Sequence, residues 1–122
     1  MFENVSINNI MGLSASVMFN VAADTIKNLN ISNVSSQSGN QVMEFFTKYI
    51  DKVSFKNISF PNTTTRGLLF RRQTKIDDVL IDNMNINAVS NTDLIQIQDT
   101  AKIKRFTIQN SKFIGNSDNI GY

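Results

Sequence analysis

The residues that could do chemistry in this chain are ten carboxylates, and no histidine or cysteine accompanies them. That absence excludes disulfides, Cys/His metal sites, thiol nucleophiles and histidine-based triads. Two carboxylates about 5–10 Å apart could cleave a glycosidic bond by acid–base catalysis. A line of carboxylates at one turn of successive repeats could instead bind Ca²⁺. Asp24, Asp51, Asp77 or Asp78, and Asp99 or Lys102 fall near one such turn, and the aspartates among them are the candidate ligands.

The simpler explanation of this line of carboxylates is that aspartate is a common residue in solvent-exposed turns. We therefore expect no catalytic residue, no metal site and no cofactor.

The basic residues form one short run, "RRQTK" at 71–75. Arg71, Arg72 and Lys75, together with Arg66, could contact an anionic glycan or a neighbouring chain. A run this short is also usual on a solvated face. The net charge of only +2 gives no reason to expect a nucleic-acid partner.

The elements that would position these side chains come from an internal repeat. Nearly the same pattern starts at Phe2, Ile26, Ile50, Ile76 and Ile103, and it reads apolar, two polar, apolar, any, apolar, any, Asn. Self-similarity at a fixed period is the signature of a solenoid. The second apolar position is Val5, Leu29, Val53, Val79 and Phe106, and the asparagine is Asn9, Asn33, Asn57, Asn83 and Asn110.

Each copy contains short strands rather than helices. The alternation of Val53 with Phe55 and of Val79 with Ile81 has a period of two, which indicates a strand. A second apolar cluster follows about 15 residues later, at 17–21, 42–46, 68–72 and 94–98. No long segment has helical spacing with caps. We predict an all-β chain with two or three short strands in each copy, joined by polar loops.

This repeat resembles the right-handed parallel β-helix of the pectin-lyase-like superfamily. The resemblance covers residues 1–122 as about four and a half coils, and its most specific element is the asparagine column. It implies that the asparagines stack as an inward ladder, each amide bonded to its neighbours, because a buried amide needs its donors and acceptors filled. Asparagine also tolerates the left-handed backbone of a tight turn. A leucine-rich repeat is the alternative, although its asparagine falls one position later.

Members of that superfamily include polysaccharide lyases and hydrolases with clustered carboxylates. The polygalacturonase pattern runs NTD, DD, G-H-G and R-I-K. This chain has "NTD" at 91–93, "DD" at 77–78 and "KIK" at 102–104, in the wrong order and without histidine. The resemblance to that catalytic pattern is best explained by chance.

Two further surface features can be read from the sequence. Among the N-x-Ser/Thr sequons, Asn62 is the best candidate for N-glycosylation, followed by Asn30 and Asn4, because Asn33 and Asn57 belong to the expected inward ladder. Outward apolar positions on the later strand are Met18, Phe46 and Leu69, and a row of them would indicate a partner surface.

These features define the expected function. Residues 1–122 are expected to form a single β-helix segment of a longer solenoid, whose open ends are covered by further coils or by other chains. We expect a non-catalytic structural or adhesive scaffold of a secreted or cell-surface protein, with glycans as possible partners and no membrane span in this segment. The alternatives are part of a carbohydrate-active β-helix, or a structural subunit of a multi-chain assembly.

Overall fold

The structure is a computed structural model, and it describes residues 1–15, 19–39, 43–63, 67–88 and 94–115. Within these ranges the chain forms strands and no helices. Their bounds are β1 Val5–Ala15, β2 Phe19–Ile26, β3 Leu29–Gly39, β4 Met43–Thr63, β5 Leu68–Phe70, β6 Lys75–Ala88, β7 Ile95–Ile97, β8 Lys102–Gln109 and β9 Lys112–Ile114.

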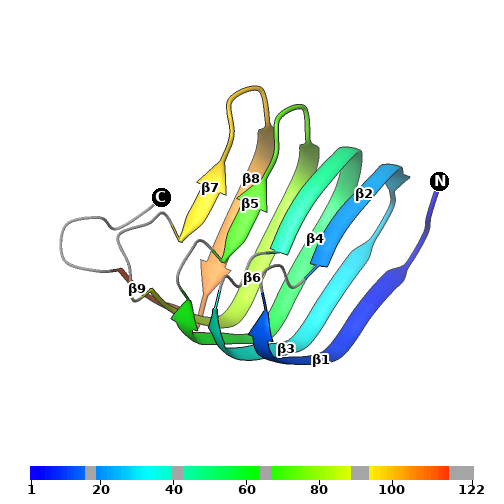
Figure 1. Ribbon diagram of the computed structural model, residues 1–122. Coiled ribbons are helices and arrows are strands. Elements are labelled where there is room, and N and C mark those ends of the chain that lie inside the picture. The colour runs from blue at the N-terminus through cyan, green and yellow to red at the C-terminus, as the bar shows by residue number, and fades with distance from the viewer. Residues whose placement is uncertain (16–18, 40–42, 64–66, 89–93, 116–122) are drawn as a thin grey trace.

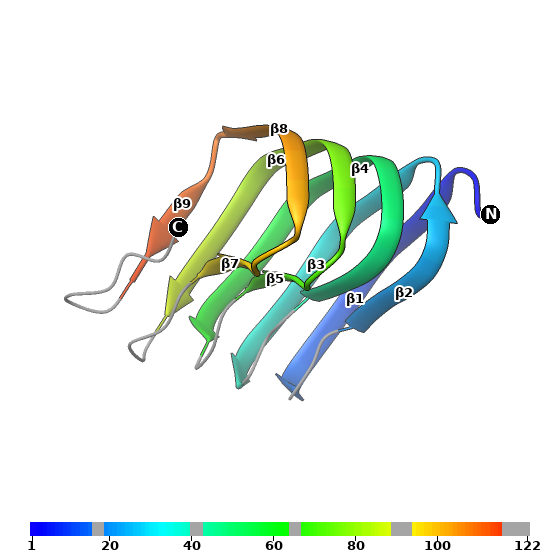
Figure 2. The same ribbon diagram turned by 90° about the horizontal axis from the view of Figure 1, so that it is seen from above.

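The strands wind into a parallel β-solenoid of about four turns. One wall has the order β1, β3, β4, β6, β8, and the wall facing it is built from β2, the first part of β4, β5 and β7. Figure 1 shows the coils stacked from the N-terminal to the C-terminal side, and Figure 2 shows β1, β3, β4 and β6 running side by side. The predicted fold class is therefore confirmed.

The pairing register matches the repeat read from the sequence. Val5 pairs with Leu29, Leu29 with Val53, Val53 with Val79, and Val79 with Phe106. Each copy of the repeat is thus one coil, because its apolar column must meet the columns of the coils on both sides. The return segments are strands, which separates this fold from a leucine-rich repeat.

The strands are longer than the sequence pattern predicts. β4 has 21 residues and includes both walls of the solenoid, with the corner between them. The polar stretches between the two apolar clusters of a copy are expected to be loops, but residues 35–39 and 61–63 of these stretches belong to β3 and β4. The reason is that backbone pairing with the neighbouring coil continues around the corners, so a turn does not end a strand.

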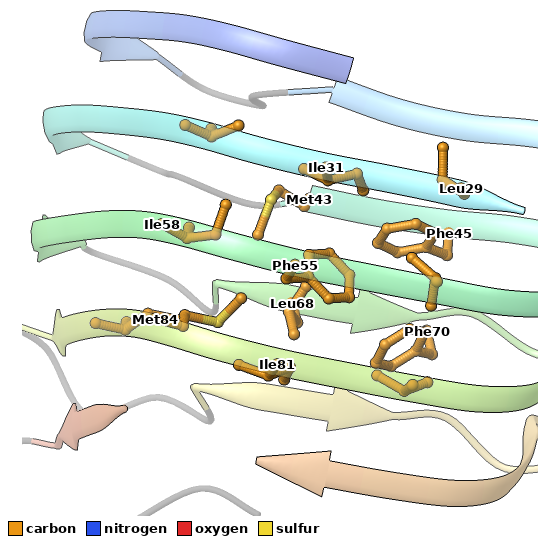
Figure 3. Packing of buried hydrophobic residues seen from close by; sticks show 14 of the residues in the cluster. Leu29, Ile31, Met43, Phe45, Phe55, Ile58, Leu68, Phe70, Ile81 and Met84 are labelled. Atoms are coloured by element: carbon orange, nitrogen blue, oxygen red, sulfur yellow. The ribbon is translucent and has the colours of Figure 1, made fainter. Parts of the chain in front are cut away.

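The core is one continuous column of apolar side chains between the two walls (Figure 3). Phe45 is central to it, with its ring stacked on Phe70 at 5.3 Å and edge-on to Phe55 at 5.6 Å between centroids. The first apolar position of the repeat is expected to fill a corner, and Ile50 and Ile76 are buried there, while Ile103 is half-buried. The apolar residue three positions after the asparagine is expected to point inward, and Phe60 and Ile86 are buried, while Phe113 is half-buried.

Burial is complete only in the middle coils. Val5, Ile7 and Ile10 of the first coil are half-buried, as is Phe106 of the last. Ile108 is 46% exposed, whereas Ile31, Phe55 and Ile81 in the same column are 0–1% exposed. The difference follows from the stacking, since an outer coil has a neighbour on only one side.

Candidate functional site

The repeated asparagines form the most regular polar feature of the molecule. All five have a left-handed backbone, with φ between 53° and 59°. The Nδ2 of Asn33 donates to Oδ1 of Asn9 at 3.1 Å, Asn57 donates to Asn33 at 3.1 Å, and Asn83 donates to Asn57 at 2.8 Å. The predicted asparagine ladder therefore exists over four coils.

The ladder ends differently from the expectation. The amide of Asn110 donates to the Asp82 carboxylate at 3.0 Å, on the neighbouring column. The Oδ1 atom of Asn83 instead accepts a hydrogen bond from Nδ2 of Asn85, at 3.2 Å. The number of residues in a coil is also larger here than in the first coils. In addition, a carboxylate is a stronger acceptor than an amide oxygen for the Asn110 amide.

The prediction that the ladder points inward is wrong. All five asparagines are exposed, whereas Phe55 and Ile58 on either side of Asn57 are buried. A left-handed residue bends the chain at the corner, and here it leaves the side chain on the solvent side, as it does for Lys56 directly before it, while Phe55 and Ile58 point into the core. The amides bond to one another along the outer corner of the solenoid.

The sequence analysis did not predict the buried polar side chains of Thr47 and Thr74, which lie where the second apolar cluster of a coil ends. Thr74 is 1% exposed, and its hydroxyl donates to the Phe45 carbonyl at 3.0 Å while accepting from the Thr47 amide at 3.3 Å. Thr47 in turn donates to the Val21 carbonyl at 3.3 Å. The signal was available, because Thr47 and Thr74 each precede a lysine at the end of the second apolar cluster.

The candidate carboxylates do not converge on one point. Most are held in separate ion pairs between adjacent coils: Asp24 with Lys48, Asp77 with Lys104, Asp78 with Arg105, and Asp99 with Arg72. Among the described residues no three acidic groups lie close enough to hold a metal ion. The "NTD" segment at 91–93 lies outside the described residues. The arrangement suits coil-to-coil cohesion rather than general acid–base chemistry.

One carboxylate carries a hydrogen-bonded chain. The Tyr49 hydroxyl donates to the carboxylate of Asp77, and Lys104 contacts the same group at 3.0 Å. The Tyr49 bond, followed by the Lys104 ammonium, holds the pKa of Asp77 below its ordinary value. The same bond raises the pKa of Tyr49, with smaller contributions from desolvation and from the Asp77 and Asp51 charges.

The Oδ1 atom of Asp51 is buried and has no hydrogen-bond partner among the described residues.

The basic run is divided by the structure. Arg71 donates through Nε and Nη2 to one oxygen of Glu44, at 3.2 and 3.0 Å, and Arg72 pairs with Asp99 at 2.8 Å. Arg66 lies outside the described residues. Lys75 is exposed on the opposite side of the corner, where its register partner is Lys102. The described members of the run thus have different partners, and the contact role of Arg66, Arg71, Arg72 and Lys75 stays a prediction.

The sequons are all on the surface. Asn4 and Asn30 are exposed and use their Oδ1 atoms as acceptors, from Asn28 and Ser54, whereas Asn62 donates its amide to the Gln37 carbonyl at 3.1 Å. Asn33 and Asn57 are exposed too, but their Nδ2 atoms are used in the ladder. The reason for excluding them as glycan acceptors is therefore the ladder bond rather than burial.

The outward apolar positions are only partly as expected. Phe46 is 51% exposed and lines an open hollow of about 310 Å³ with Ala22, Thr47 and Arg72. Leu69 faces the same outer side but is 3% exposed, between its register partners Glu44 and Gln96. Met18 lies outside the described residues. No continuous apolar row is present on this wall in the described part of the chain.

Compared with known proteins, the chain matches no family model, no curated protein and no solved structure. The part that the structure describes has no helix with the length and hydropathy of a membrane span. The solenoid itself is thus the firm basis for a functional argument.

Proposed function

We propose that this chain is a non-catalytic structural or adhesive scaffold segment of a larger secreted or cell-surface protein. The observation that carries the proposal is the coil-to-coil use of its polar side chains. The asparagine amides and most of the candidate carboxylates bond to the next coil, at separations of 24 to 28 residues in the sequence. Side chains used in this way stiffen a rod and are not available to a substrate.

The proposal includes kinship with the pectin-lyase-like superfamily, based on the 24–27-residue coil and the asparagine column. It also includes N-glycosylation of Asn62, Asn30 and Asn4, which are all exposed. At Asn62 the modification would replace the single bond from Nδ2 to the Gln37 carbonyl, whereas at Asn33 or Asn57 it would interrupt the ladder. The carbohydrate-active alternative is less well supported, because the described carboxylates are dispersed among ion pairs.

The test uses serum raised against the folded chain. We expect it to label intact source cells or the secreted fraction, and to detect on a blot a polypeptide well above 13.7 kDa. Labelling that appears only after permeabilisation would contradict the proposed location. In parallel, release of reducing or unsaturated ends from polyuronates by the purified chain would contradict the non-catalytic role.

A second candidate is a structural subunit whose ends are covered by other chains. It is favoured by apolar side chains on the outer coils: Met11 is 75% exposed, and Ile97 and Ile114 are 47% and 42% exposed. Edge strands with unpaired backbone groups also promote association. We expect light scattering after size exclusion to show a mass that grows with concentration. A constant mass of 13.7 kDa at every concentration would contradict this candidate.

A further inference from the structure

Two lysines lie side by side where β6 meets β8. Lys75 and Lys102 are register partners in that pairing, and both are exposed. Adjacent strands are about 4.8 Å apart, and paired residues project to the same face. Like charges placed directly opposite each other destabilise a sheet. An anion bound between the two lysines would relieve this repulsion.

The rest of the described chain avoids such a contact. Lys27, Lys48, Arg71, Arg72, Lys104 and Arg105 are each paired with a carboxylate. The register partners of Lys52 and Lys56 are Asp78 and Asp82. Within the described residues, neither Lys75 nor Lys102 has a carboxylate at ion-pair distance. This is the one described strand pairing that places two cations together.

The two lysines line an open hollow of about 600 Å³, together with Tyr49, Asp77 and Lys104. The Asp77 carboxylate accepts a hydrogen bond from the Tyr49 hydroxyl, and it forms an ion pair with the Lys104 ammonium at 3.0 Å. Three cations and one anion leave these groups with a net charge of +2. Asp51, one coil earlier, does not line the hollow.

We propose that this lysine hollow, defined by Tyr49, Lys75, Asp77, Lys102 and Lys104, binds a doubly charged tetrahedral oxyanion. Phosphate and sulfate have the required charge as free ions, and so does a phosphate monoester on a larger molecule. Each ammonium offers three donors, and hydrogen bonds between ions are stronger than neutral ones. The anion would bridge Lys75 and Lys102 and remove their repulsion. This binding activity goes beyond the scaffold role and does not depend on it.

The experiment is an amide NMR titration of the full chain in mildly alkaline buffer, where both phosphate and a phosphate monoester are doubly charged. Sodium phosphate, sodium sulfate and sodium methyl phosphate are each compared with sodium chloride at matched ionic strength. We expect saturable shifts at residues 75–77 and 101–104 with the three oxyanions and not with chloride. Tighter binding of methyl phosphate than of phosphate would indicate an esterified ligand, and the reverse a free ion.

The variants separate a site from general attraction. The double variant Lys75→Gln/Lys102→Gln is expected to bind at least about tenfold more weakly, since it removes two charge-assisted hydrogen bonds. The control, Lys52→Gln/Lys56→Gln, has the same change of net charge on the same wall, and we expect it to bind like the parent chain. Equal weakening by both double variants, or shifts that do not saturate, would overturn the proposal.

A second measurement does not depend on the double variant folding well. Lys102→Glu converts the like-charge pair into an ion pair, so it should raise the thermal midpoint at low salt. Sulfate stabilises folded proteins in general, so the quantity compared is the rise of the midpoint with added sulfate in the parent chain and in Lys102→Glu. We expect the larger and saturable rise in the parent chain, and an equal rise in the two proteins would overturn the proposal.

Discussion

Each asparagine of the ladder combines a backbone requirement with a side-chain one. Asn57 has φ of 58°, a conformation that costs most L-residues about 1–2 kcal/mol. Its side-chain Oδ1 also accepts a hydrogen bond from Asn83, and its Nδ2 donates one to Asn33. Asparagine meets both requirements, because its short amide supports the left-handed backbone and reaches the next coil.

We expect Asn57→Ala to lower the free energy of unfolding by about 1–3 kcal/mol, because it loses the ladder bonds and strains the left-handed backbone. Asn57→Gly keeps the backbone conformation and should lose only about 0.5–1.5 kcal/mol. Denaturant unfolding of the three proteins measures both values. A glycine variant as stable as the parent chain would show that the exposed ladder bonds add nothing.

The Tyr49–Asp77 bond should make the free energy of unfolding depend on pH in two ranges, one acidic and one basic. The folded-state pKa of Asp77 is lowered, so its contribution is present above the ordinary pKa of about 4 and is lost as the pH falls through the folded-state value. The pKa of Tyr49 is raised, so its contribution is present below about pH 10 and is lost as the pH rises through the folded-state value.

The variant Tyr49→Phe should therefore be less stable than the parent chain at neutral pH, and the difference should shrink in strong acid and strong base. Unfolding curves across the pH range test this expectation. The Asp77 pKa, followed by carbon NMR, should rise in the variant toward its ordinary value without reaching it, because Lys104 remains. A pH-independent difference would mean that the hydroxyl acts through packing alone.

At the scale of elements, the unusual feature is that strands continue through corners. β4 pairs with β2 and β5 through its first part, and with β3 and β6 through its second. β5, by contrast, has three residues and begins directly after Gly67, which lies against the side chain of Ile86. The position of β5 depends on the absence of a side chain at that point.

We expect Gly67→Ala to lower the free energy of unfolding by about 1–3 kcal/mol, because a Cβ there would clash with Ile86 and approach Phe60 within 3.5 Å. Both neighbours are buried and cannot move into solvent. The control is Ser59→Ala on the exposed side of β4, which should change stability by less than about 0.5 kcal/mol. Thermal unfolding of the two variants measures the difference, and equal stabilities would contradict the packing argument.

At the scale of the whole molecule, each coil contacts only its neighbours, so stability should vary along the rod. We expect the slowest amide hydrogen exchange at Val53, Phe55 and Val79, and the fastest at Ile7 and Ile108 in the outer coils. The reason is that the middle coils bury their side chains completely and pair on both edges. Uniform exchange along the chain would instead indicate one cooperative unit.

The repeat made much of this fold predictable. A coil of 24 to 27 residues and an apolar column at fixed offsets are properties of the chain itself, and they imply the parallel register of Val5, Leu29, Val53, Val79 and Phe106. The asparagine column was likewise visible, since a residue suited to the left-handed backbone returned at one point of every coil. These features are local or periodic, and periodicity survives in sequence.

The tertiary structure decided the features that depend on direction and on neighbours. It placed the asparagines outside the corner, because the chain bends around the core and only the three-dimensional path says which side is convex. It paired Arg71 and Arg72 with carboxylates and left Lys75 beside Lys102, because such contacts join positions 27 residues apart. The sequence determined which residues share a column, and the winding of the coils determined which side of the wall each column faces.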